Sequence, residues 1–244
     1  MSDDELELKL LKGSAFELEG IKITPLKLKE IIDDIGYDDY LQLIKTVCID
    51  KKQIKDISEE DLQKIETFDI FLCDNSLMEM LVRFFKVFLK YENVFYIEKN
   101  QGILFDYDGC ISWVTRENYN KFLKVFREMY KINIPKQEEY NPGNDRAREL
   151  IEAIKRKNEV YANMKAKSET NLASMISGVA WKSNNLNIVD IFNLTVYQLY
   201  DAYYRLEIVD NYTNTINGVY AGTVDGKKID FKQLTWIKRY IEKN

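Results

Sequence analysis

Residues that could perform catalysis or bind a metal are few in this chain. No histidine is present among its 244 residues, which removes the most common general base and the most common zinc ligand. The three cysteines, Cys48, Cys73 and Cys110, lie 25 and 37 residues apart, a spacing that fits neither a CxxC metal site nor a disulfide framework. We interpret them as reduced thiols of the hydrophobic core. Any catalysis would then depend on carboxylates, lysine, tyrosine or a bound cation.

Two groups of carboxylates are the remaining candidates for such chemistry. The first is a set of four aspartates around a predicted helix end: Asp33, Asp34, Asp38 and Asp39. Their spacing lacks the alternating ligands and the final glutamate of a calcium loop. The second group, Asp106 and Asp108, flanks a tight turn, where aspartate is favoured because it hydrogen-bonds to the backbone. Phosphate-binding glycine loops, GxSxG and HExxH do not occur either. We therefore predict a protein that is not an enzyme and has no catalytic residue, metal or cofactor.

The composition indicates a soluble, core-forming polypeptide. The formal charge is −5, from 35 Lys and Arg against 40 Asp and Glu, and 45% of the residues are hydrophobic. An acidic start without a signal peptide, and the lack of a long apolar run, predict that the protein does not bind a membrane. The one basic stretch, residues 144–167, mixes seven basic with four acidic residues. Nucleic-acid binding normally needs a clustered basic face, so we predict no nucleic-acid partner.

Apolar periodicity predicts an α+β fold that is predominantly α-helical, in two parts. Residues 1–135 are expected to form a helical domain with a small antiparallel β meander. Its strands are predicted near residues 6–23, where Leu6, Leu8 and Leu10 alternate with polar residues, and over residues 94–113, where turn signals separate three apolar runs. A helix that is apolar around most of its circumference, Met78 to Leu89, is expected at the centre of this core.

Residues 136–142 are predicted to be a linker, and residues 143–244 an all-α helical bundle. Thr195 with Gln198 forms a capping-box pattern at the start of one helix, and Asp230 with Gln233 predicts another. A third helix has an amphipathic face over residues 172–180, and Trp181 is a candidate extension of that face.

Two patterns in this second part are candidates for partner binding. The helix expected after Gly143 carries a narrow apolar seam that includes Leu150, Ile154 and Tyr161. A seam this thin is typical either of an exposed helix that bridges two parts or of a helix that docks a partner or a second copy. Tyr197 and Tyr204, seven residues apart, are placed to share an exposed contact strip, whereas Tyr200 and Tyr203 are expected in the core.

The sequences of several segments, and their order along the chain, resemble those of a family of tail assembly chaperones from long-tailed phages and prophages of low-GC Gram-positive bacteria. Besides the meander, the segments are LKLKEIIDDIGYDDYLQLI, ETFDIFL, NPGNDRARELIEAIKRK and NLASMISGVAWKSNNLNIVDIFNLTVYQLYDAYYRLEIVDNY. The similarity spans nearly the whole chain and is densest over residues 172–212. These markers build helices and carry no chemical signature.

The resemblance implies a non-enzymatic protein in the cytoplasm of the bacterial host. It would coat the phage tape measure protein, keep that protein soluble and recruit the tail tube protein. Self-association along the tape measure would add avidity. The family carries over no catalytic residue. Three alternatives remain: a structural virion protein of the phage tail or baseplate, an enzyme that uses carboxylates or a cation, and an acidic regulatory or nucleic-acid adaptor.

Overall fold

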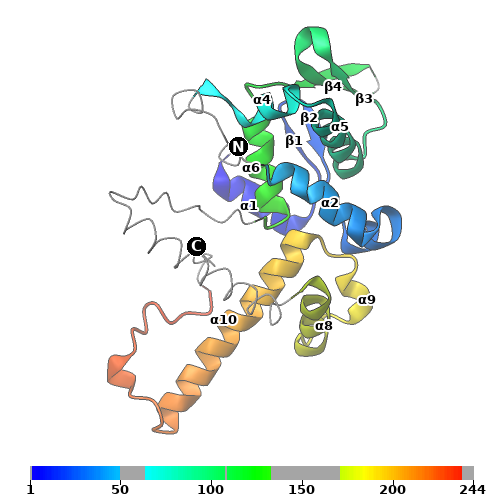
Figure 1. The fold of residues 1–244 in the computed structure, drawn as a ribbon. Coiled ribbons are helices and arrows are strands. Elements are labelled where there is room, and N and C mark those ends of the chain that lie inside the picture. Colours follow the sequence, from blue (N-terminus) through cyan, green and yellow to red (C-terminus); the bar gives the residue numbers. More distant parts are fainter. Residues whose placement is uncertain (1, 50–63, 108, 133–170, 238–244) are drawn as a thin grey trace, which may run out of the picture.

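The computed structural model describes residues 2–49, 64–107, 109–132 and 171–237 (Figure 1). The fold is α+β and predominantly helical, as predicted. The elements of the first part are α1 (Asp3–Lys12), β1 (Phe16–Leu18), β2 (Ile21–Ile23), a π-helical turn (Glu30–Ile35), α2 (Tyr37–Val47), α4 (Thr67–Leu72), α5 (Asn75–Leu89), β3 (Val94–Ile97), a 3-10 turn (Glu98–Asn100), β4 (Gly102–Tyr107), β5 (Cys110–Val114) and α6 (Tyr119–Met129). The elements of the second part are α8 (Leu172–Lys182), α9 (Ile188–Ile191), α10 (Val196–Tyr220) and a 3-10 turn (Gly226–Lys228).

The first helix corrects the sequence prediction, because the alternating leucines form α1 and not a strand. Ser2 caps α1, its side chain accepting a hydrogen bond from the Glu5 amide, and Gly13 ends it in the left-handed conformation at φ +65°. Leu6 and Leu10, one helical turn apart, are buried, whereas the intervening Leu8 is exposed. The strands of this region begin only at β1, which pairs with β2 in a short antiparallel hairpin.

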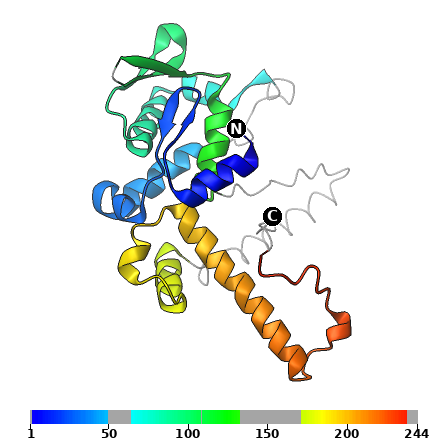
Figure 2. The same ribbon diagram turned by 180° about the vertical axis from the view of Figure 1, so that it is seen from behind.

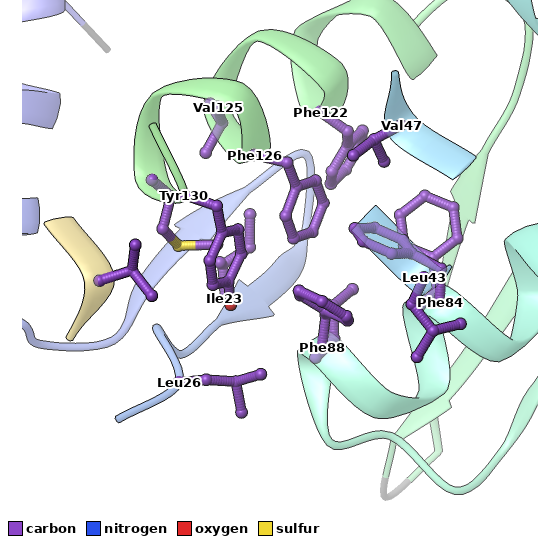
Figure 3. Packing of buried hydrophobic residues seen from close by; sticks show 14 of the residues in the cluster. Ile23, Leu26, Leu43, Val47, Phe84, Phe88, Phe122, Val125, Phe126 and Tyr130 are labelled. Carbon is purple, nitrogen blue, oxygen red and sulfur yellow. The ribbon is translucent and has the colours of Figure 1, made fainter. Parts of the chain in front are cut away.

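The aromatic core of the first part lies between α5 and α6. The rings of Phe84 and Phe88 stack with centroids 4.4 Å apart, and Phe126 meets Phe84 edge-on at 4.9 Å. Tyr130 closes the cluster at 4.9 Å from Phe88. Figure 3 shows these rings together with side chains of the β1–β2 hairpin and α2. The prediction that the apolar helix is central to the core is confirmed, since six residues of α5 are buried.

The predicted meander is confirmed as a three-stranded antiparallel sheet in the order β3-β4-β5. Val94 pairs with Phe105, which in turn pairs with Ser112. Because side chains alternate along a strand, Ile103 and Phe105 of β4 are buried on the face toward the core, while Leu104 lies on the other face and is half-buried.

Helices and turns make up the second part in the range that the structure describes, and α10 is the longest of these helices. Thr195 and Gln198 form the predicted capping box, with Thr195 N donating to Gln198 Oε1 at 2.9 Å and Gln198 N donating to Thr195 Oγ1 at 3.3 Å. Both views show α10 running away from the first part, and the chain after it returning in the opposite direction (Figures 1 and 2).

The predicted helix after Asp230 is wrong for the residues that the structure describes. Gln233 and Leu234 amides donate to the Asp230 carbonyl, but residues 230–237 form turns and irregular backbone, and no helix. The predicted linker, residues 136–142, lies outside the described residues, so the division into two domains stays a prediction.

Backbone and side-chain hydrogen bonds attach the start of α10 to the first part. Leu28 N donates to Leu194 O at 2.8 Å and Lys29 N to Phe192 O at 2.9 Å. Gln198 adds a third bond, its Nε2 donating to Leu11 O at 2.8 Å. These bonds fix the direction in which α10 leaves the first part.

Candidate protein-binding surface

The three C-terminal helices are held together along one face of α8. Met175, Ile176 and Val179 of α8 are buried in the same apolar cluster as Val196 and Leu199 of α10. Lys182 at the end of α8 forms an ion pair with Asp210 of α10. Asn171 and Asn187 cap α8 and α9 through their side chains. The backbone of this unit is therefore fixed by packing and caps.

Trp181 stands out on this unit because its side chain meets almost nothing. It is 88% exposed, although tryptophan offers one of the largest apolar surfaces of any side chain. Trp181 follows the buried Val179 by two residues, which places it about 200° around the helix from the packed face. It does not extend the buried face, so this sequence expectation is wrong. A helical wheel of residues 172–182 contains the signal that would have identified it.

Other large apolar residues of the second part are exposed as well. On α9, Val189 is 68% and Ile188 is 44% exposed. At and after the far end of α10, the exposed large apolar residues include Tyr220, Phe231 and Trp236. Arg205 Nη1 donates to the Trp236 carbonyl at 3.0 Å, which connects the returning segment to α10. None of these residues was selected from the sequence.

Of the five residues predicted to bind a partner, two lie in the part of the chain that the structure describes. Leu150, Ile154 and Tyr161 lie outside the described residues, so the seam stays a prediction. Tyr197 is only 5% exposed and belongs to the buried apolar core, and Lys131 Nζ lies 4.4 Å from the centroid of its ring. Tyr204 is half-buried. The expected exposed strip of two tyrosines is therefore wrong in its geometry.

The neighbours of Tyr204 on α10 explain its partial burial. Its ring lies 5.9 Å from that of Tyr200 and 5.4 Å from that of Tyr203. Tyr200 and Tyr203 themselves pack against the core and are half-buried, as expected from the sequence. The three rings form one aromatic cluster on the first half of α10, and its outer part is accessible to solvent.

The groups considered for catalysis or metal binding are dispersed or paired. Among residues 2–49, 64–107, 109–132 and 171–237, no three Cys, Asp or Glu side chains lie close enough to hold a metal ion. Asp39 forms an ion pair with Arg83 at 2.7 Å. Asp108 lies outside the described residues.

The cysteines are free thiols, but only one resembles a core residue. Cys48 is half-buried, and burial raises the pKa of its thiol, whereas Cys73 and Cys110 are exposed. The prediction that all three belong to the core is wrong, because Cys73 follows the end of α4 and Cys110 begins an edge strand.

None of the helices in the part of the chain that the structure describes is long and apolar enough to cross a membrane. Large apolar side chains exposed on a rigid helical surface are typical of a site where another polypeptide docks.

Comparison with known proteins points to the same region of the chain. Residues 163–240 match the family model described as the YomV second domain, a phage-associated family. This range includes α8, α9, α10 and the segment that returns after α10. No curated protein and no solved structure matches the chain. The match supports the phage association expected from the sequence.

Proposed function

We propose that this protein is a non-enzymatic phage tail assembly chaperone that binds the tape measure protein, keeps it soluble and supports polymerisation of the tail tube. It acts in the cytoplasm of the bacterial host. Its role is to cover apolar surface on another polypeptide, and it transforms no substrate.

The observation that carries this proposal is the exposure of Trp181 on a helix whose opposite face is packed. The residue lies within the range that matches a phage-associated family. Val189 and Ile188 on the adjoining helix α9 are exposed too. An amphipathic helix binds a partner through its apolar face, and tryptophan is enriched among residues that dominate binding energy.

The physical requirements of a chaperone agree with these features. A long helical protein that has not yet been assembled exposes apolar stripes that aggregate. A chaperone must cover such stripes and later be displaced, which favours a modest interface of mixed polarity. Trp181 adjoins Lys182, which pairs with Asp210, so charged groups border the apolar anchor.

Co-expression with the tape measure protein from the same phage genome tests the proposal. We expect a soluble tape measure protein that elutes together with the chaperone in size-exclusion chromatography. An insoluble tape measure protein and no complex would contradict the proposal. We also expect the chain to be missing from purified virions in mass spectrometry. Its retention at a fixed copy number would instead indicate a structural protein of the tail or baseplate.

A further inference from the structure

The joint between the two parts of the structure is built at the start of α10. Both views show this end of the helix against the first part (Figures 1 and 2). Besides the backbone bonds from Leu28 and Lys29, an isolated antiparallel bridge pairs Lys27 with Thr195. The Glu30 carboxylate accepts a hydrogen bond from the Lys27 amide at 2.8 Å. The first part therefore presents a fixed edge with which the chain before α10 pairs.

Apolar side chains at the joint belong to a core that both parts share. Val196, Tyr197 and Leu199, in the first turn of α10, are at most 5% exposed and lie in the same buried cluster as Leu28 of the first part. Units of about 60 residues bury only about 60% of the surface of their unfolded chain, and they are marginally stable alone. Residues 171–237 form a unit of about this size, so the core that it shares with the first part is a large fraction of its stabilisation.

Gln198 forms hydrogen bonds in two directions from one amide group. Its Oε1 accepts from Thr195 N at 2.9 Å within the capping box, and its Nε2 donates to Leu11 O at 2.8 Å, at the end of α1. Glutamate fills the position in a capping box as well as glutamine does, but an ionised carboxylate has no donor for the second bond. The close approach depends on Gly13, where a Cβ would lie 2.9 Å from Nε2. The amide group of Gln198 therefore connects two helices as well as starting one.

Lys131 contacts α10 from the end of α6. Its Nζ lies 4.4 Å from the centroid of the Tyr197 ring and 2.6 Å from Glu128 Oε1, and its side chain is 18% exposed. The backbone of Lys131 has a φ of +50°, a left-handed conformation that is costly for a residue with a Cβ. Such a conformation persists where the surrounding contacts hold it. The contact with Tyr197 is of this kind, so the ends of α6 and α10 stabilise each other.

From the shared core, the two bonds of one amide and the strained lysine, we infer that the fold of the second part depends on this joint. The joint is defined by Gln198 and Tyr197 on α10 and by Leu11 and Lys131 on the first part. While it is closed, α8, α9 and α10 keep their packing. When it opens, these helices lose part of their core and unfold together. Trp181 lies on α8, so the joint also controls whether the exposed surface around Trp181 exists.

Gln198→Glu in the full-length chain tests this dependence. The substitution keeps the acceptor for Thr195 N and replaces the donor to Leu11 O by a carboxylate oxygen, so it breaks only the bond between the two parts. Hydrogen–deuterium exchange is measured by mass spectrometry on peptides from α8 and α10. We expect the amides from Met175 to Val179, on a different helix from the substitution, to exchange about tenfold faster, because a carbonyl at the joint is left unpaired. The first turns of α10 should change by the same factor.

Gln42→Glu is the matched control, because it adds the same charge at an exposed position of α2. It should leave exchange in α8 and α10 unchanged. Lys131→Met is a second, independent variant that removes the ammonium group near the Tyr197 ring and keeps an aliphatic side chain. It should accelerate exchange in the same two helices. Circular dichroism shows whether each variant is folded.

Three results would overturn the inference. The first is faster exchange in the first turns of α10 with no change in α8, because the second part would then stay folded without the joint. The second is unchanged exchange in both Gln198→Glu and Lys131→Met. The third is an equal effect of Gln42→Glu. All measurements are made without the tape measure protein, so their failure would leave the proposed chaperone function unaffected.

Discussion

Replacing Trp181 by alanine separates binding from stability more sharply than any other change on this surface. Since the residue is 88% exposed, only 12% of its surface is covered. For a side chain of about 250 Å² this corresponds to about 30 Å². At about 25 cal/mol per Å², the loss of that contact costs about 0.8 kcal/mol of unfolding free energy. We expect a shift of that size or smaller in urea denaturation.

The expected effect on binding is larger, because the exposed part of the ring would be buried only in the complex. A tryptophan at the centre of an interface typically contributes about 2 kcal/mol or more, equivalent to a change in Kd of about 30-fold. Affinity is measured by titrating labelled peptides from the tape measure sequence and following fluorescence anisotropy. Trp181→Ala should raise Kd by at least that factor.

Val179→Ala is the matched control, two residues away on the packed face of α8. Val179 is 1% exposed, so the truncation should lower the unfolding free energy by about 2 kcal/mol and leave the Kd of the folded protein unchanged. The reasoning is refuted if Trp181→Ala destabilises the fold as much as Val179→Ala does, or if the two variants bind the peptides equally well.

Four further substitutions test the fold. Phe84→Ala should lower the unfolding free energy by about 3–5 kcal/mol in urea, because it empties the centre of the aromatic core; a loss below about 1 kcal/mol would show that this core is loosely packed. Gly13→Ala should lower the free energy of unfolding by about 1–2 kcal/mol, because Gly13 has a φ of +65°. The loss should be larger if the new Cβ, 2.9 Å from Gln198 Nε2, also breaks the hydrogen bond from Gln198 to Leu11. Gly222 also has a positive φ, +72°, but a Cβ at this position would have no heavy atom within 4 Å, so Gly222→Ala measures the backbone effect alone. Equal losses of unfolding free energy in the two variants would exclude a steric effect at Gly13. Burial raises the pKa of Glu30, but hydrogen bonds from Lys90 Nζ at 2.6 Å and the Lys27 amide at 2.8 Å outweigh it, so the pKa lies below its usual value. Its stabilisation is therefore present above the unfolded-state pKa of about 4.3 and is lost as the pH falls through the lowered pKa. Glu30→Gln should lower the free energy of unfolding at pH 7 by about 0.5–1 kcal/mol, which is seen as a lower Tm. In acid the Tm values of the variant and the wild type should converge, and a Tm difference that is the same at every pH would contradict the assignment.

Local signals in the sequence were sufficient for the meander and for the start of α10. Alternating apolar residues between turn residues specify short antiparallel strands, and the bonds between Thr195 and Gln198 involve residues only three positions apart. The leucines of α1 show how a local signal can mislead. Their alternation suggested a strand, but Ser2 and Gly13 cap a helix in which Leu6 and Leu10 share a face. Ser2 and Gly13 were visible in the sequence as possible caps. Such residues satisfy the unpaired N–H and C=O groups at the ends of a helix, and the alternation of leucines gives no information about these groups.

The sequence by itself determined the fold class and the scarcity of residues suited to catalysis, because composition and periodicity follow from the order of residues alone. The tertiary structure decided the burial of side chains that are covered by segments distant in the sequence. Tyr197 is buried in the apolar core, where Lys131, 66 positions earlier, lies over its ring, and Ser112 Oγ donates to the carbonyl of Gly20, 92 positions earlier. Exposure depends on which distant segments pack against a residue, and periodicity within one helix or strand carries no information about those segments.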